Sequence, residues 1–379
     1  MNKLLIISHT EHYKDSNGII VGWGPTVTEL NYLTTIFDEV IHLAPFHHEI
    51  APKSAIPYQN NIKYIPLKFS GGKGLRKLSI CLYAPYNLSI VKKYSREASI
   101  IQFRAPTGIG LYILPYLKYF NNKPYWVKYA GNWIATELPL GNKFQRWWLK
   151  NKISLDTKVT VNGNWLNENE NIKAFENPCL NENERVVGKE YLNNKNLEGK
   201  CNYCFVGGLN DNKGIKKLVN VFRTLANEKL GTLHIVGDGV LRDEVEEVAK
   251  NTKNNIVFHG FLSKKHILEI YKKCHFIVLP SKSEGFPKVI GEAMNFGCIP
   301  IVSKVSCINQ YIDHHINGYL IHALKEESLK QALLQSLILS KEDFNKIVAV
   351  NHKIAEKFTY SYYLKRIQKE ILGETDHKI

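Results

Sequence analysis

Short apolar runs alternate with longer segments of mixed polarity along this chain, most clearly in its second half. The runs are close to continuous in apolar residues, which is typical of parallel strands buried on both faces. After the run at 203–206, apolar residues recur at 215, 218, 219, 222 and 225, which is helical spacing. Strands alternating with such helices predict βαβ units and a parallel sheet. The expected strands are 203–206, 233–236, 256–258, 276–279 and 299–302, and the expected helices are 215–227, 240–250, 264–273 and 289–296.

The first half shows the same alternation less regularly. The stretch 167–196 is dense in Asn and Glu, as a surface linker would be, so we place a domain boundary near it. We expect two doubly wound α/β domains, 1–176 and 177–357, with ligands at the carboxyl ends of the strands. The expected strands of the first half are 4–7, 39–43, 62–66, 100–103, 125–128 and 158–161, with a helix at 27–37.

Composition is that of an ordinary folded protein. The 379 residues are 44% hydrophobic and 22% charged without a low-complexity tract, which excludes a disordered chain, a collagen-like chain and a disulfide scaffold. The charge is unusual, because 50 Lys and Arg residues stand against 35 Asp and Glu, a net charge of +15. Such a surface attracts nucleic acid, anionic lipid headgroups or phosphorylated substrates, and the charge alone does not choose among them.

Targeting, membrane and redox signals are weak. The apolar run at 4–7 is too short for a signal peptide, and no stretch approaches the ~20 apolar residues of a membrane helix. Seven irregularly spaced cysteines fit a reducing compartment, and we interpret Cys201 and Cys204 as structural thiols rather than a metal or redox site. We therefore expect a cytoplasmic protein, with peripheral contact at the inner membrane face left open.

The most informative segment is 281–300, which has the order loop, helix, helix cap and strand. Glu284 lies in the loop after the expected strand 276–279, and Pro287 suits the first turn of a helix. The free N–H groups of that turn form an anion site, and Glu292 lies further along the same helix. A ligand with a diphosphate and two sets of hydroxyl groups would use all three features. The alternative is that both glutamates are surface carboxylates, one of them partly capping the helix.

This segment resembles the Glu-x7-Glu signature of the retaining glycosyltransferases of family 4, which have the GT-B fold. It matches every fixed position of the pattern Glu-Gly-Phe-(Gly/Pro)-x4-Glu-Ala-Met-x2-Gly from Glu284 to Gly297. The resemblance implies two Rossmann-like domains facing each other across a cleft, and a last helix, 358–379, that crosses back to the first domain. The resemblance to the family is specific over residues 203–322 and looser over the N-terminal half. Further matching segments are 205–209 with Lys213 and Gly214, 234–239, 257–260 and 317–320.

The resemblance also implies a role for each matched residue. Lys213 would contact the donor diphosphate, and Glu284 the hydroxyls of the transferred sugar, which makes these two the catalytic candidates. Glu292 would bind the ribose hydroxyls of a UDP- or GDP-linked sugar. No metal or other cofactor is expected, because fixed cations and amides would balance the charge of the leaving diphosphate. The other donor-binding positions implied are Gly208, Gly260, Leu262, Gly285, Phe286, Pro287, Lys288 and Val289.

One departure from the family pattern concerns the diphosphate. The family has an arginine where this chain has Gly208. Losing one of two cations would cost several kcal/mol of transition-state stabilisation, on the order of what one fixed donor supplies. Lys216, Lys282 or Lys288 could supply the missing charge; otherwise the chain is a weaker or divergent member.

The N-terminal half would bind the acceptor. Gly24 ends the loop after the first strand, and in the family such a loop approaches the diphosphate or the acceptor. Asn132 stands where many members have a histidine facing the donor sugar; the alternative is a polar turn. His9 lies beyond the first strand, where it could face the cleft, and no other ligands cluster near its HxxH spacing with His12 to form a metal site.

Two segments concentrate positive charge. Residues 142–152 mix cations with Phe144, Trp147 and Trp148, and 68–77 is a second basic run. Cations mixed with aromatic residues are typical of an interfacial segment on anionic lipid, so we expect a peripheral membrane contact through 142–152. The alternative is that the tryptophans belong to the core and the cations form a solvated face.

The leading hypothesis is a metal-independent, retaining glycosyltransferase that moves a sugar from a nucleotide-diphosphate-sugar to a glycan or lipid-linked acceptor. The expected setting is surface polysaccharide biosynthesis, whether lipopolysaccharide, O-antigen or capsule. The alternatives are a divergent GT-B protein with weak or altered activity and a basic polyanion-binding protein. No zinc-finger, RNP or helix-turn-helix signature supports nucleic-acid binding.

Overall fold

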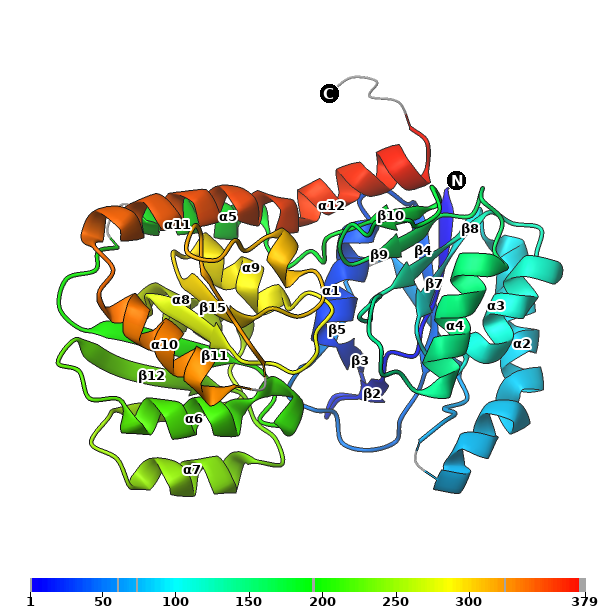
Figure 1. Cartoon of the computed structure of the whole chain (residues 1–379). Helices are drawn as coiled ribbons and strands as arrows, with labels where there is room; N and C mark the ends of the chain where they lie inside the picture. Colours follow the sequence, from blue (N-terminus) through cyan, green and yellow to red (C-terminus); the bar gives the residue numbers. More distant parts are fainter. Residues whose placement is uncertain (1, 60, 73, 193–194, 324, 375–379) are drawn as a thin grey trace. The chain divides into compact units, whose positions relative to one another are not determined.

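The computed structural model describes residues 2–59, 61–72, 74–192, 195–323 and 325–374. The chain divides into two compact units, residues 1–175 with 364–379, and residues 176–363. Each unit is built on a parallel sheet with helices around it (Figure 1). The expectation of an α/β protein with two doubly wound sheets is therefore confirmed.

The first unit contains a seven-stranded parallel sheet in the order β10-β9-β8-β7-β1-β4-β6. Figure 1 shows α1 on one face of this sheet and α2, α3 and α4 on the other. The strands are β1 (Lys3–Ile7), β4 (Glu39–Pro45), β6 (Ile62–Leu67), β7 (Ile100–Ala105), β8 (Tyr125–Tyr129), β9 (Val159–Val161) and β10 (Ile172–Ala174), and the helices are α1 (Gly24–Leu33), α2 (Ser79–Glu97), α3 (Gly110–Tyr119) and α4 (Leu140–Asn151). Apolar residues of β1, β7, β8, α3 and α4 form the buried core on the α2–α4 face.

A small antiparallel sheet accompanies the large one. Its strands are β2 (His12–Lys14), β3 (Ile20–Trp23) and β5 (Ala55–Pro57), in the order β2-β3-β5. The alternation of apolar runs did not predict these strands, because each has only three or four residues and lies outside the parallel layer. Strand β3 leads directly into α1, so Gly24, the first residue of α1, follows a strand and not the expected loop.

The second unit contains a six-stranded parallel sheet in the order β13-β12-β11-β14-β15-β16. This is the strand order of a nucleotide-binding Rossmann sheet, with the first strand at the centre. The strands are β11 (Cys201–Val206), β12 (Leu230–Val236), β13 (Ile256–Gly260), β14 (Phe276–Leu279), β15 (Ile299–Ser303) and β16 (Tyr319–Ile321). The helices are α5 (Glu182–Leu192), α6 (Ile215–Thr224), α7 (Arg242–Lys250), α8 (Lys264–Lys273), α9 (Lys288–Asn295), α10 (Glu326–Leu337), α11 (Lys341–Ala355) and α12 (Tyr360–Arg366).

The last helix links the two units. A single 3-10 turn, Glu356–Phe358, separates α11 from α12, and α12 continues as a π-helical segment, Ile367–Ile371. The boundary between the units falls inside α12, after Tyr363. Residues 375–379 of the expected last helix lie outside the described residues.

The prediction of a surface linker at 167–196 is wrong in part, because strand β10 and helix α5 lie within this stretch. Helix α5 begins with a capping box: Asn181 Oδ1 accepts from Glu184 N at 2.8 Å, and Glu184 Oε2 accepts from Asn181 N at 2.9 Å. Arg185 then donates to Asn295 Oδ1 of α9 at 2.6 Å. Hydrogen bonds of polar side chains, and not an apolar stripe, hold this helix in place. Its amino-acid composition is therefore similar to that of a loop, which is why the sequence predicted a linker.

Candidate functional site

Two loops meet at the centre of the second sheet. Loop 207–213 follows β11 and loop 280–287 follows β14, and these two strands are neighbours. After β11 the chain continues to β12 on one side of this strand pair, and after β14 it continues to β15 on the other side. This is the topological switch point, where doubly wound sheets bind their ligands.

The two loops are joined by hydrogen bonds and an ion pair. Lys282 N donates to Asn212 O at 2.7 Å, and Asn212 Nδ2 donates to Ser283 O at 3.0 Å. Lys213 Nζ lies 2.5 Å from Glu284 Oε1, with the lysine partly exposed and the carboxylate nearly buried. The structure thus brings together Lys213 and Glu284, the two catalytic candidates, across the switch point.

Backbone geometry fixes the position of Lys213. Asn210 Oδ1 accepts from Lys213 N at 3.1 Å, and the chain turns into α6 at Gly214 with φ +70°. A β-carbon on Gly214 would lie 2.2 Å from Pro280 O, so a glycine is required where the β11 loop passes the end of β14. At Gly208 a β-carbon would lie 3.0 Å from Asn210 Nδ2. The Asn210 amide therefore lies beside the position from which the family arginine would extend.

Helix α9 begins beside the Glu284 loop. Pro287 is its N-cap with extended backbone angles, and among the described residues no side chain caps the helix. The side chain of Phe286 stacks on Phe358, with ring centroids 4.5 Å apart, and meets Tyr311 edge-on at 4.9 Å. Because this side chain belongs to the core, the anion-site hypothesis assigns the backbone of Phe286, and not its ring, to the ligand. The backbones of Gly285, Lys288 and Val289 stay predicted contacts.

Glu292 lies about one turn further along α9, where charged groups of α8 and α5 act on it. Tyr271 OH donates to Glu292 Oε2 at 3.3 Å. Burial raises the pKa of the Glu292 carboxyl above its ordinary value, the charge of Glu184 acts in the same direction, and the ammonium groups of Lys264 and Lys288 oppose them. The carboxylate is thus held at an electrostatic cost, which is typical of functional positions.

Sequence reasoning missed Lys264, which begins α8. Its Nζ lies 2.6 Å from Cys179 O and 2.8 Å from Glu184 Oε1. Burial alone would lower the pKa of Lys264, but the negative charges of Glu292 and Glu184 outweigh it and raise that pKa. No motif marked this lysine; only folding places it near Glu292.

Gly260 and Leu262 lie at the carboxyl end of β13, the edge strand of this sheet. Gly260 has φ +66°, and a β-carbon there would lie 3.0 Å from Arg242 Nη1. The Arg242 side chain is itself held by Glu246 at 2.8 Å and Asp238 at 3.5 Å. The predicted base-binding positions are therefore on the same edge of the sheet as Lys213 and Glu284, next to a guanidinium that the motifs did not indicate.

The three N-terminal candidates belong to the first unit. His9 follows β1, and its partly buried ring meets Phe69 edge-on at 5.6 Å; burial lowers its pKa, and His47 acts in the same direction. Gly24 N donates to Ser54 O at 2.9 Å, and a β-carbon on Gly24 would lie 2.8 Å from that oxygen. Asn132 Oδ1 accepts from Ile134 N at 3.2 Å, as in a polar turn. These contacts account for Gly24 and Asn132 structurally and leave their binding roles as predictions.

His12 belongs to a buried polar network rather than to a pair with His9. Its Nδ1 lies 2.8 Å from Thr10 O and its Nε2 lies 2.5 Å from Tyr58 OH, which also contacts His42 Nδ1 at 2.6 Å. Burial lowers the pKa of His12 to about 4, so its imidazole is neutral near pH 7. Among the described residues, no group of three or more His, Cys, Asp or Glu is arranged to hold a metal ion.

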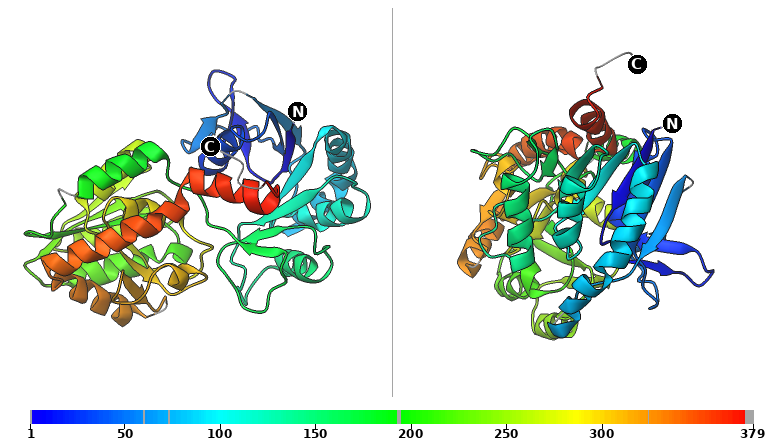
Figure 2. Two further views of the ribbon diagram at one scale, coloured as in Figure 1. Left: turned by 90° about the horizontal axis from the view of Figure 1, so that it is seen from above. Right: turned by 90° about the vertical axis from the view of Figure 1, so that its right-hand side faces the viewer.

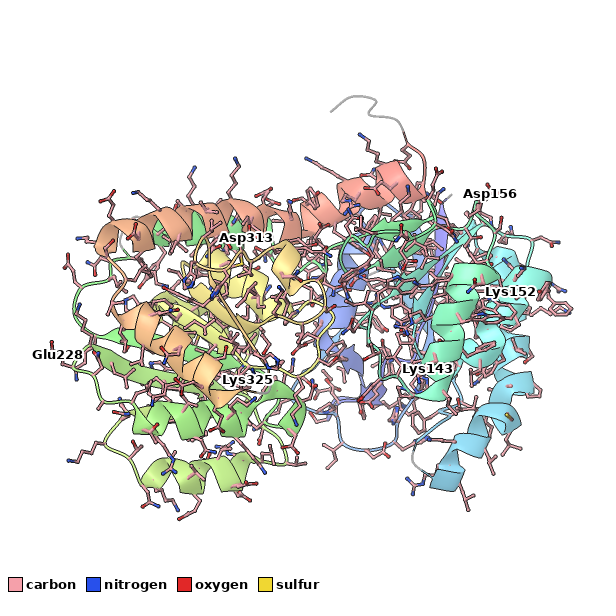
Figure 3. All side chains as sticks on the ribbon, in the orientation of Figure 1. Lys143, Lys152, Asp156, Glu228, Asp313 and Lys325 are labelled. Atoms are coloured by element: carbon pink, nitrogen blue, oxygen red, sulfur yellow. The ribbon has the colours of Figure 1, made fainter. Side chains whose placement is uncertain are left out.

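The aromatic residues of 142–152 all lie on α4. Phe144, Trp147 and Trp148 contact one another, and Trp148 also meets Tyr119 edge-on. Figure 3 labels Lys143 and Lys152 near the two ends of this helix. In the described part of the chain, no helix is both long enough and apolar enough to cross a membrane.

The second unit matches a known family. Residues 189–349 match the family model described as glycosyl transferases group 1. An uncharacterised glycosyltransferase of Methanocaldococcus jannaschii is 30% identical over 187 residues, 48% of this chain and 50% of that protein. An uncharacterised 41.2 kDa protein in the cps region of Klebsiella pneumoniae is 30% identical over 173 residues, 46% of this chain and 42% of that protein. The chain thus spans about half the length of the curated relatives it matches.

Solved structures match almost the whole chain at low identity. Sucrose-phosphate synthase from Thermosynechococcus elongatus has a TM-score of 0.73 at 15% identity, covering 99% of this chain and all of that one. Anabaena HepE in complex with UDP and glucose has a TM-score of 0.69 at 15% identity, with the same coverage. Likeness at this identity concerns the fold, which is the expected GT-B fold. The protein thus has the α/β GT-B fold, and its residues 189–349 are similar to the group 1 glycosyl transferases.

Proposed function

We propose that this protein is a retaining glycosyltransferase that moves a sugar from a nucleotide-diphosphate-sugar to a hydroxyl group of a glycan or lipid-linked acceptor. The observation that carries the proposal is the ion pair of Lys213 and Glu284 at the switch point of the second sheet. It joins a cation suited to a diphosphate with a carboxylate suited to sugar hydroxyls. The family match at 189–349 and the UDP-bound neighbour support the donor class.

The reaction requires stabilisation of the leaving group, the nucleotide diphosphate. The bond from the anomeric carbon to the diphosphate oxygen breaks, and the electron pair leaves with the nucleotide diphosphate. The acceptor oxygen bonds to that carbon on the face from which the diphosphate leaves, and its proton passes to the departing diphosphate oxygen. Lys213 would stabilise the negative charge that grows on the diphosphate. Glu284 would accept hydrogen bonds from the transferred sugar, and Glu292 from the ribose. The amides at the start of α9 would hold phosphate or sugar hydroxyls.

Lys282 is the best placed substitute for the arginine missing at Gly208. Its backbone is tied to Asn212 O in the Lys213 loop, and the residue is exposed. Lys216 is instead paired with Glu244 at 2.7 Å on the surface, and Lys288 interacts electrostatically with Glu292. These contacts favour Lys282 as the second cation at the diphosphate.

We expect Lys282→Ala to lower turnover by about tenfold, because a mobile, exposed cation contributes less than a fixed one. Lys216→Ala is the matched control, since it removes the same charge from a neighbouring position, and its turnover should stay near that of the wild type. Release of nucleotide diphosphate measures both. Equal effects in the two variants would contradict the assignment of Lys282.

The first unit would bind the acceptor, with His9, Gly24 and Asn132 as candidate contacts. The relative encoded in a Klebsiella cps region favours a role in surface polysaccharide biosynthesis, for which capsule, lipopolysaccharide and O-antigen are all suitable products. Metal independence and a cytoplasmic location are part of the proposal. They rest on the cations at the switch point and on the cytosolic supply of nucleotide sugars that this reaction needs.

A thermal-shift screen over UDP-, GDP- and ADP-sugars tests this function without an acceptor. A ligand at about 100 times its Kd stabilises the folded state by about 2.7 kcal/mol, and about 2–4 °C of melting temperature accompanies each kcal/mol in a domain of 150–250 residues. We expect one nucleotide to produce such a saturable shift and the others much less. No shift with any of them, together with steeply salt-dependent binding to duplex DNA, would favour a polyanion-binding protein instead.

A further inference from the structure

One segment of the first unit carries much of the chain's positive charge. Residues 50–96 contain nine Lys and Arg and no Asp or Glu, so more than half of the net charge of +15 originates there. The segment covers β5, β6, a 3-10 turn at Gly74–Leu78 and α2 as far as Arg96; the last residue of α2, Glu97, is acidic and lies just outside it. Lys73 lies outside the described residues; the cations next to it in the sequence, Lys68, Arg76 and Lys77, are exposed.

The same segment exposes a row of large apolar side chains. The relative exposures are 85% for Leu75, 67% for Leu78, 71% for Leu82 and 49% for Tyr86. Their spacing of three, four and four residues places them on one side of the continuous helical run from the 3-10 turn into α2. Scattered exposed apolar residues are ordinary, but a consecutive row with this spacing marks an interaction surface. We call Leu75, Leu78 and Leu82 with Arg76 and Lys77 the leucine surface.

The opposite side of α2 explains why the leucines point outward. Asn87, Val91 and Ser95 are buried against the unit. Asn87 Oδ1 accepts from Lys68 N at 2.9 Å, and its Nδ2 donates to Lys68 O at 3.1 Å and to Tyr112 OH at 3.0 Å. The helix therefore cannot rotate to bury its leucines without breaking a buried set of hydrogen bonds, which costs about 1–3 kcal/mol for each group left unpaired.

Contacts at the start of α2 hold the leucine surface in place. Ser79 Oγ accepts from Gly71 N at 2.9 Å and donates to Arg76 O at 2.5 Å. Figures 1 and 2 show the N-terminal end of α2 extending past α3 and α4 within its unit. The leucine surface is thus an ordered, protruding, basic and apolar end of a helix.

We propose that the leucine surface docks on an anionic lipid bilayer. Leucines that enter the acyl boundary and cations that meet lipid phosphates are the two attractions an interfacial helix uses. Exposed leucines contribute little to a nucleic acid, whose backbone is read by charge. A second copy of this chain would bring two such cationic segments together, and their repulsion opposes pairing. The inference does not depend on the transferase activity.

This surface differs from the expected one at 142–152. On α4 the aromatic rings of Phe144 and Trp148 are partly buried and pack on neighbours, so less apolar area faces water there. Leu140 and Trp147 are its exposed large apolar residues. Lys150 of α4 is also paired with Glu168. The larger exposed apolar area therefore favours the end of α2 as the principal contact.

Co-sedimentation of the full chain with vesicles tests the inference. The probe is an equimolar mixture of phosphatidylcholine and phosphatidylglycerol, with phosphatidylcholine alone for comparison. We expect binding to the anionic vesicles that weakens as sodium chloride screens the charge, and little binding to the neutral ones. Equal binding to both compositions, or none to either, would overturn the proposal.

Variants locate the contact. Leu75→Ser/Leu78→Ser/Leu82→Ser should lower the partition coefficient by about tenfold or more, because three side chains lose their burial in the bilayer. Leu155→Ser/Leu166→Ser, at two exposed leucines of the same unit, is the matched control and should bind as the wild type does. Arg76→Glu/Lys77→Glu should weaken binding more than Lys92→Glu/Lys93→Glu, which makes the same charge change toward the other end of α2.

Several outcomes would overturn the proposal. Wild-type vesicle binding by the triple variant is one, and loss of binding only in Leu140→Ser/Trp147→Ser is another, since it would place the contact on α4. A concentration-dependent dimer that the triple variant abolishes, without vesicle binding, would identify a second copy as the occupant. Salt-sensitive binding to duplex DNA without vesicle binding would identify nucleic acid. Melting temperatures near that of the wild type verify that the variants are folded.

Discussion

Lys213→Ala is expected to lower turnover by about 10²–10³-fold, the loss seen when one preorganised group that stabilises a developing negative charge is removed. Lys213 is held by Asn210, by the turn at Gly214 and by Glu284, so its ammonium is fixed before any ligand arrives. A fixed cation needs little reorganisation as charge grows on the leaving diphosphate. Single-turnover release of nucleotide diphosphate at saturating donor measures the effect on the chemical step.

Glu284, the ion-pair partner of Lys213, provides the control variant. Glu284→Gln removes the charge that binds Lys213 but keeps a group able to contact sugar hydroxyls, so we expect a smaller loss of turnover. Because the two side chains touch, the double variant Lys213→Ala/Glu284→Gln should lose less than the product of the two single effects. Wild-type turnover in Lys213→Ala would contradict the site, and so would strictly multiplicative effects, since they would mean that the ion pair is unrelated to the reaction. Thermal unfolding separates loss of chemistry from loss of stability.

Most strands of the two parallel sheets were predictable, because buried parallel strands are continuous apolar runs. The edge strands β10 and β16 were not predicted, since each has only three residues. Runs such as 276–279 contain little besides apolar residues, and β14 begins and ends where expected. Helices α2, α3 and α4 were not assigned from the sequence, although each has at least one buried apolar residue. Pro85 and Pro115 lie inside the first two, and proline in a helix interior obscures the helical pattern.

The candidate site was predictable only as far as local motifs extend. Glu284 and Lys213 stand in recognisable segments, and their meeting follows from strand order, since β11 and β14 are neighbours. Lys264, Arg242 and Asn212 were not predicted, because each lies in a separate segment and gains its place only through packing of α8, α7 or the β11 loop. A motif identifies residues within one contiguous segment, whereas these supporting groups come from separate segments that only the folded chain brings together.

Glu292→Gln is expected to weaken nucleotide binding by about ten- to hundredfold, because hydrogen bonds to a charged acceptor contribute about 1.5–3 kcal/mol. The folded protein should not become less stable. The pKa of Glu292 is raised above the ordinary 4.5, mainly by burial, so its ionisation costs folding free energy at every pH above the raised value. The amide removes that cost, and Lys264 keeps Glu184 as its partner. Melting temperature near neutral pH should therefore stay the same or rise.

The raised pKa also sets the pH dependence of binding. In the wild type, nucleotide affinity should fall as the pH drops toward and through the raised pKa of Glu292, because the protonated carboxyl loses acceptor capacity. In Glu292→Gln this dependence should be absent. Isothermal titration of the nucleotide found in the thermal screen, near neutral pH and at about pH 5, measures both. Glu269→Gln, which changes an exposed glutamate of α8 paired with Lys272, is the control. Lower stability combined with unchanged affinity would show that Glu292 serves the fold rather than the donor.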